Sequence, residues 1–243
     1  MSHLPGVFLT TQSVVSSAGE TWQISADESD ACAHLKALRL KNGDACLLLN
    51  GRGEITRVEL IDSKTFAVKT LDHRQVAPAA LPIDLYLSPP KGDDLDRSLQ
   101  ICVELGVRRL HLFQSEHSAH TTTLKLGRLR RIAQSSCEQS LNPWLPEIID
   151  HGRVSLAELV ATAHRHAKEV LSFDESLAET KSFFKVKSPA ASYACFVGPE
   201  GGWSAAEREL FASLKVSRAS LGPIVLKVPT AICAALSVLR SST

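Results

Sequence analysis

Hydrophobic positions along the first 75 residues come in short runs, which is typical of β-strands. The runs occupy residues 7–9, 21–25, 45–50, 55–61 and 65–71. Turn-like pieces rich in glycine and asparagine separate them, and one short helix is predicted over residues 30–38. Several short strands at this spacing favour a small β-barrel.

From residue 83 onward the pattern changes to alternating strands and helices. Strands are predicted over residues 83–88, 107–113, 169–173, 193–197 and 218–221. The helices between and after them are predicted over 94–105, around 129–140, 156–167, 205–214 and 230–239. Gly106 stands where glycine often ends a helix. This alternation indicates an α/β domain with a mainly parallel sheet.

A proline-containing segment with few large apolar residues separates the two patterns and is typical of a linker. We therefore predict an N-terminal domain over residues 1–73, a linker over 74–82 and a C-terminal domain over 83–243.

Two glycine-proline loops follow strands of the second domain. The first is Gly198-Pro-Glu-Gly-Gly202, and the Ser204–Glu207 spacing after it is a capping box that starts a helix. The second turns at Gly222-Pro223. One interpretation is a pair of tight turns. The other is a ligand floor, because open α/β sheets bind ligands at the carboxyl ends of their strands.

The chemistry of the first loop differs from that of known phosphate loops. Neither G-x-x-x-x-G-K-[ST] nor G-x-G-x-x-G spacing occurs. The G-x-S-x-G motif of serine hydrolases is absent as well. Glu200 inside the loop would repel a phosphate and suits a cationic or zwitterionic ligand better. Two such loops in successive units predict a composite binding site.

Composition narrows the class of protein. Of the 243 residues 44% are hydrophobic and 22% charged, with a net charge of +1, which is ordinary for a globular protein and leaves nucleic-acid contact to local patches. The six cysteines form no Cys-x-x-Cys pair, which favours a reducing compartment and no metal site. We expect a cytoplasmic protein, because no apolar run reaches about 18 residues and no signal-peptide pattern occurs.

These motifs carry a family resemblance. "FVGPEGGWSAAERELF" and then "SLGPIVLKVPTAICAALSVL" resemble the C-terminal signature of the RsmE family, SPOUT-class methyltransferases that make 3-methyluridine in small-subunit ribosomal RNA. Upstream, "LSPPKGDDLDRSLQICVELGVRRLHLFQSEHS", "CEQS" and "LPEI" follow in the family's order, and "HLKALRLKNGD" and "NGRGE" are similar to its PUA-like barrel. The resemblance covers nearly the whole chain.

The resemblance implies a trefoil-knotted methyltransferase domain that binds S-adenosyl-L-methionine, a PUA-like RNA-binding barrel, a homodimer and a role in 16S rRNA modification without a metal. The implied cofactor-binding residues are Phe173, Val197, Gly198, Glu200, Gly201, Gly202, Leu221, Gly222 and Leu226. The glycines would let the backbone approach the cofactor. Lys227, Thr230 and Glu138 are the candidate catalytic residues.

The chain departs from the family pattern in two places. Lys227 stands where an arginine is usual, and Pro229 replaces an acidic residue. Asn142 and Trp144 occupy frequently basic positions. Lysine supplies positive charge without the bidentate fork of arginine.

Other charged residues allow two interpretations each. Lys36, Arg39 and Lys91 are candidates for RNA contact, since basic contacts to phosphates dominate nucleic-acid affinity; a solvated basic face is the alternative. Glu116 and Glu138 are candidate acid–base or substrate-orienting groups, with an ion pair or helix cap as the alternative.

Three functions therefore remain open. The first is methylation of uridine N3 in small-subunit rRNA. The second is a catalytically weak or inactive rRNA-binding or ribosome-assembly protein on the same fold, which the substituted positions favour and the two intact loops oppose. The third is methylation of a different uridine or RNA, because a fold does not specify its RNA site.

Overall fold

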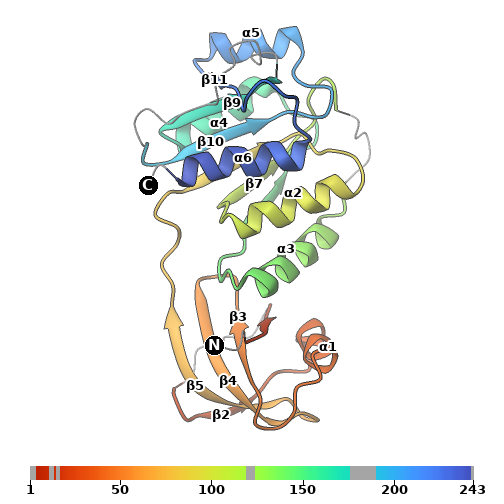
Figure 1. Ribbon diagram of the computed structural model, residues 1–243, viewed down its shortest axis with the longest axis vertical. Helices are drawn as coiled ribbons and strands as arrows, with labels where there is room; N and C mark the ends of the chain where they lie inside the picture. The colour runs from red at the N-terminus through yellow and green to blue at the C-terminus, as the bar shows by residue number, and fades with distance from the viewer. Residues whose placement is uncertain (1–3, 11–13, 15–16, 119–123, 176–189, 242–243) are drawn as a thin grey trace. The chain divides into compact units, whose positions relative to one another are not determined.

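The computed structural model describes residues 4–10, 14, 17–118, 124–175 and 190–241. The chain divides into two compact units, one formed by Met1–Pro78 with Ala133–Leu145 and the other by Ala79–Ile132 with Pro146–Thr243. Figure 1 labels their helices and strands.

The first unit is built on a five-stranded sheet in the order β1-β3-β4-β5-β2. Its strands are β1 (Gly6–Phe8), β2 (Thr21–Gln23), β3 (Ala45–Leu49), β4 (Glu54–Asp62) and β5 (Ala67–Gln75), and its helix is α1 (Ser29–Ala37). β1 and β3 run parallel and the other pairs antiparallel. Val7, Leu48, Val58 and Leu35 belong to its buried core. All five predicted strands and the helix are present.

β5 is longer than the apolar pattern predicts. It continues through Gln75, which pairs with Glu54, and Arg74 pairs with Ile55. The strand therefore continues two residues past residue 73, where we predicted the N-terminal domain to end. The apolar pattern does not predict this extension, because its side chains are polar and its pairing is made by backbone groups.

A segment distant in sequence completes this unit. It is Ala133–Leu145, the C-terminal part of α3 (Leu126–Ser140) with the turn that follows. Gly53 N–H donates to the Pro143 carbonyl at 2.9 Å, and Leu145 N–H donates to the Gly51 carbonyl at 3.1 Å. Gly53 has φ +92°, and a Cβ there would collide with Trp144 and Gln75. A domain boundary placed at one point of the sequence cannot predict that a distant segment belongs to the first unit.

The second unit is built on a six-stranded sheet in the order β11-β9-β10-β6-β7-β8, in which every pair is parallel. Its strands are β6 (Ile83–Leu87), β7 (Arg109–Leu112), β8 (Glu147–Asp150), β9 (Glu169–Phe173), β10 (Tyr193–Val197) and β11 (Ser217–Ala219). The predicted parallel sheet is confirmed. The sequence did not predict β8, a four-residue edge strand with a polar residue at each end.

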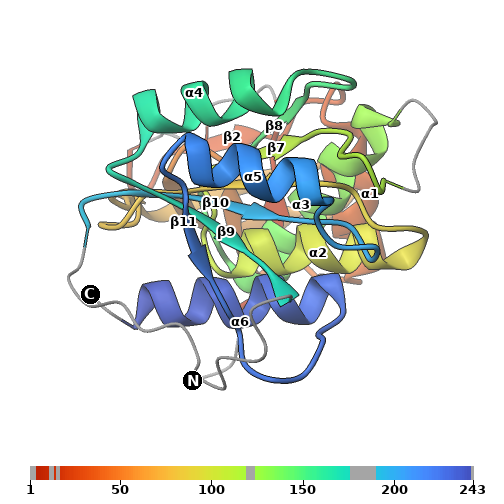
Figure 2. The ribbon, with the colours of Figure 1, turned by 90° about the horizontal axis from the view of Figure 1, so that it is seen from above.

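Helices cover both faces of this sheet. They are α2 (Asp93–Glu104), α4 (Leu156–His166), α5 (Ala205–Ser213) and α6 (Val228–Arg240), and the unit also contains the start of α3. Figure 2 shows α4 and α5 on one side of the sheet and α2 and α6 on the other. Leu159 and Val160 of α4 and Phe211 of α5 pack on Tyr86 and Phe196 of the sheet.

Two helix boundaries follow from local chemistry predicted above. Gly106, at φ +67°, donates its N–H to the Val103 carbonyl and ends α2. Ser204 Oγ accepts from Glu207 N–H at 3.1 Å while the Glu207 carboxylate accepts from Ser204 N–H at 2.8 Å, so the predicted capping box of α5 is confirmed. α6 begins two residues earlier than predicted, because proline is well tolerated in a first helical turn.

No helix among the described residues has the length and hydropathy needed to cross a membrane.

Candidate active site

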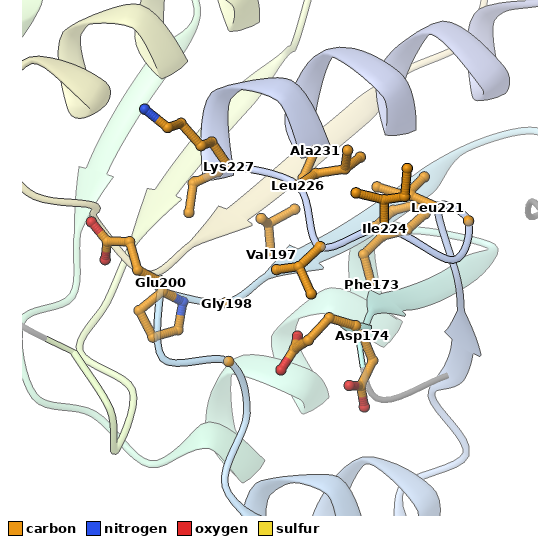
Figure 3. Close-up of a pocket in the computed structure, with 16 residues that line it drawn as sticks. Phe173, Asp174, Val197, Gly198, Glu200, Leu221, Ile224, Leu226, Lys227 and Ala231 are labelled. Atoms are coloured by element: carbon orange, nitrogen blue, oxygen red, sulfur yellow. The ribbon is translucent and has the colours of Figure 1, made fainter. Parts of the chain in front are cut away.

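A cavity of about 280 Å³ opens where β9 and β10 end and where the chain passes from β11 to α6. Its walls come from three segments, residues 173–175, 197–202 and 221–231. The carboxyl ends of neighbouring parallel strands meet there, which is the usual ligand position in such sheets. Figure 3 shows Phe173, Val197, Leu221, Leu226 and Ala231 around the cavity, which give it an apolar interior.

Most of the predicted cofactor-binding residues line this cavity. They are Phe173, Val197, Gly198, Glu200, Gly202, Leu221, Gly222 and Leu226. Lys227 also lines it, whereas Gly201, Thr230 and Glu138 do not. The structure therefore brings the two glycine-proline loops together into one site. Asp174 and Glu175 line the cavity as well, and the sequence analysis missed both.

The glycines of the first loop make room for protein side chains. A Cβ on Gly198 would lie 3.2 Å from the Trp203 ring, and one on Gly201 would lie 3.0 Å from the Cβ of His117. Gly202 has φ +66°, and a Cβ there would collide with the Glu175 carboxylate. At these three positions the missing side chain therefore lets the loop pack against Trp203, His117 and Glu175.

Asp174 is the centre of a buried ion cluster beside the cavity. Its carboxylate, only 1% exposed, accepts from Arg208 Nε at 3.0 Å and from Arg218 Nη2 at 2.5 Å. Arg208 also contacts Glu175 at 3.1 Å. Hydrogen bonding to Asp174 raises the pKa of Arg208 above its ordinary value. A fixed charge cluster thus supports this wall, and its only sequence signal was an acidic pair directly after β9.

Glu200 connects the cavity to another loop. Its Oε1 accepts from the backbone N–H of Lys91, in the loop between β6 and α2, at 2.9 Å. Lys91 itself is exposed. The glutamate inside the glycine loop therefore fixes the position of the lysine that the sequence analysis singled out.

Lys227 stands at the N-cap of α6 and is exposed. Figure 3 shows its ammonium group extended away from the apolar side chains of the cavity. Pro229, at the position that is usually acidic, is buried in the first turn of the helix. Lys227 is accordingly the positive group at the mouth of the site, while Thr230 lies one turn further along α6 and is exposed.

Glu138 has a different place. Its Oε1 accepts from Phe8 N–H at 2.9 Å and its Oε2 lies 3.1 Å from His34 Nδ1, all within the first unit. Burial raises the pKa of this carboxyl, while the Phe8 N–H and His34 act in the opposite direction. These contacts match the ion-pair interpretation of Glu138, and they join α3 to β1 and α1.

The other predicted RNA-binding residues belong to the first unit. Lys36 places its ammonium 5.5 Å from the centre of the Phe66 ring, and Arg39 is exposed with φ +54°. Among the described residues, no group of three or more histidine, cysteine or acidic side chains could hold a metal ion.

An all-parallel α/β unit with a ligand cavity at its strand ends, together with a small β unit, is the architecture expected from the resemblance. Residues 77–240 match the RNA methyltransferase domain family, and residues 29–71 match the RNA methyltransferase PUA domain. The chain belongs to this RNA methyltransferase family. The fold class expected from the resemblance, a SPOUT-class domain with a PUA-like domain, is confirmed.

Relatives and solved structures agree with this assignment. The chain is 28% identical over 241 residues to the ribosomal RNA small subunit methyltransferase E of Bacillus subtilis, covering 92% of this chain and 91% of the relative. It is 28% identical over 209 residues to the protein of that name from Synechocystis, covering 83% and 67%. The Neisseria gonorrhoeae ribosomal RNA small subunit methyltransferase E, bound to S-adenosyl methionine, superposes with a TM-score of 0.81 at 24% identity, covering 98% of each chain.

Proposed function

We propose that the protein methylates N3 of a uridine in 16S rRNA of the small ribosomal subunit, with S-adenosyl-L-methionine as methyl donor. The observation that carries the proposal is the convergence of both glycine-proline loops on one cavity with an apolar interior and a charged mouth. The names of the relatives support the small subunit as substrate, and the RsmE resemblance supports uridine N3.

The cavity residues suit the proposed cofactor. Apolar walls from Val197, Leu221 and Leu226 would hold the adenine, and the carboxylates at the rim suit the positive charges of the amino and sulfonium groups. When bound, the cofactor supplies an electrophilic methyl group. Lys227 would stabilise the uracil anion that remains after N3 loses its proton, as a preorganised charge close to the developing one.

A homodimer completes the proposal. Ile224 and Val225, in the second loop, are 74% and 71% exposed, and they are the exposed large hydrophobic side chains beside the cavity. Covering them with a second copy would bury apolar surface and close the cavity mouth. The first unit, with Lys36 and Arg39, would contact rRNA phosphates in the cytoplasm, where small subunits assemble.

The test is transfer of labelled methyl from S-adenosyl-L-methionine to small subunits from a strain that lacks the protein. Nucleoside mass spectrometry then identifies the product. We expect 3-methyluridine, and loss of the label with Lys227→Ala while calorimetric binding of the cofactor persists.

The alternative functions give different results. Cofactor binding without any methylated nucleoside would favour a binding protein on this fold. A different methylated nucleoside, or methylation of RNA other than 16S rRNA, would favour a different substrate.

A further inference from the structure

The loop that follows β7, residues 114–118, is held by contacts from several directions. Ser88, which is fully buried, lies 3.0 Å from Ser115 Oγ and 2.5 Å from Ser118 Oγ, so the three hydroxyl groups form one cluster. Gln114 N–H donates to the Gly152 carbonyl at 2.9 Å. The loop is therefore a fixed part of the edge at which β6 and β7 end.

The same loop is joined to the glycine loop of the cavity. The buried carboxylate of Glu207 accepts from Glu116 N–H at 3.0 Å through Oε1, while Oε2 completes the capping box of α5. His117 Nδ1 lies 3.1 Å from the Gly201 carbonyl and 3.3 Å from the Gly202 carbonyl. These contacts link the loop after β7 to the segment that forms one wall of the cavity.

The His117 contact defines which ring nitrogen carries a proton. Both partners are carbonyl oxygens, which only accept, so Nδ1 must be the donor. The bond therefore exists with the neutral ring and with the charged ring. A side chain at Gly201 would push His117 away, since a Cβ there would lie 3.0 Å from the His117 Cβ.

The group that this arrangement presents is Glu116. Its backbone is fixed by Glu207, its side chain is exposed, and no described residue hydrogen bonds to its carboxylate. An exposed carboxylate on a backbone that is held beside the glycine loop of the cavity is suited to accept a proton from a ring N–H.

We propose that Glu116 is the substrate-facing carboxylate and that His117 is a positioning residue, which locks the loop of Glu116 to the glycine loop of the cavity. The proposal rests on the proposed function. The proton that N3 must lose passes to a carboxylate oxygen of Glu116 and from there to solvent. His117 does not touch the substrate; it fixes the backbone from which the Glu116 carboxylate extends.

Three variants separate these roles. His117→Ala removes the donor. His117→Asn keeps one, because the amide nitrogen of asparagine, like Nδ1 of histidine, stands two bonds from Cβ. Glu116→Gln keeps the size of the side chain and the backbone bond to Glu207, and it removes the proton acceptor.

Three quantities are measured for each variant. They are hydrogen exchange of the free protein, calorimetric binding of the cofactor, and the rate of single-turnover methylation at saturating cofactor. For His117→Ala we expect at least about 10-fold faster exchange in residues 114–118 and about a 10-fold slower transfer. Its cofactor Kd should stay within about threefold of wild type. His117→Asn should restore both values, and Glu116→Gln should slow transfer by about 10² or more without changing exchange.

Three results would overturn the proposal. One is a His117→Asn variant as slow as His117→Ala with normal exchange, since the ring itself would then be required. Another is unchanged exchange and rate in His117→Ala. The third is Glu116→Gln with wild-type transfer. Wild-type protein that transfers no methyl group would instead defeat the proposed function, and the proposal with it.

Discussion

A buried histidine in the second unit should make the protein lose stability at mildly acidic pH. His111 on β7 is 2% exposed, and its ring stacks on Tyr86 with a centroid distance of 4.1 Å. Its Nδ1 lies 2.9 Å from His151 Nε2. Burial lowers the pKa of His111 from 6.5 to about 4, and the neighbouring His151 contributes in the same direction.

The direction of the change in stability depends on which state, folded or unfolded, binds the proton at the higher pH. As pH falls through 6.5, the unfolded chain protonates His111 while the folded protein keeps it neutral, so proton binding stabilises the unfolded state relative to the folded one. Below about pH 4 the folded protein also takes up the proton and the loss stops growing. A pKa lowered from 6.5 to about 4 corresponds to about 3 kcal/mol in full, and to about 2 kcal/mol between pH 8 and pH 5.

Urea unfolding at pH 8, 7, 6 and 5 measures this effect, by comparing wild type with His111→Asn. The variant should be less stable at pH 8, because the stack is lost, but its stability should fall by about 2 kcal/mol less on going to pH 5. Asp84, Arg109, His151 and His166 also act on the ring, and they remain in both proteins.

Tyr86→Phe is the matched control. It keeps the aromatic stack and removes a hydroxyl whose pKa burial raises to about 12, so its effect on stability should be independent of pH over this range. Equal pH dependence in wild type and His111→Asn would refute the reasoning, because His111 would then be protonated as readily in the folded protein as in the unfolded chain.

Four further substitutions, at three positions, test the site and the first unit. Gly202→Ala should weaken calorimetric cofactor binding by about 10-fold or more, because the new methyl group displaces Glu175 at a positive φ. Lys227→Arg should raise the single-turnover methylation rate and Lys227→Ala should lower it by about 10², if a positive group at this position stabilises the substrate anion. Gly53→Ala should lower the free energy of unfolding by about 2–4 kcal/mol in urea titrations, since a Cβ collides with Trp144.

Local signals in the sequence predicted most of the elements. The Ser204–Glu207 capping box and Gly106 at the end of α2 are set by residues within a few positions of each other, and the structure contains both. The five strands of the first unit followed from apolar runs. The edge strand β8 and the extension of β5 are held by backbone pairing with distant strands, for which side-chain pattern gives no signal.

Long-range contacts explain what the sequence could not predict about the site. Glu138 is a candidate acid–base group from its place in the CEQS motif, yet its partners Phe8 and His34 lie more than 100 positions earlier in the chain. Asp174 and its two arginines come from three different segments. Composition and spacing do not reveal which charges will meet.

The glycine loop illustrates why residue type alone does not assign a role. The loop does border the cavity, but the Cα positions of its three glycines face Trp203, His117 and Glu175. A substitution at Gly201 or Gly202 that abolishes activity would therefore report on the packing of the loop as much as on cofactor contact. Direct contact is better tested at Leu226, an apolar residue of the cavity wall. Leu226→Ala removes wall surface without backbone strain, so weakened cofactor binding with unchanged stability would identify a contact that the glycines cannot.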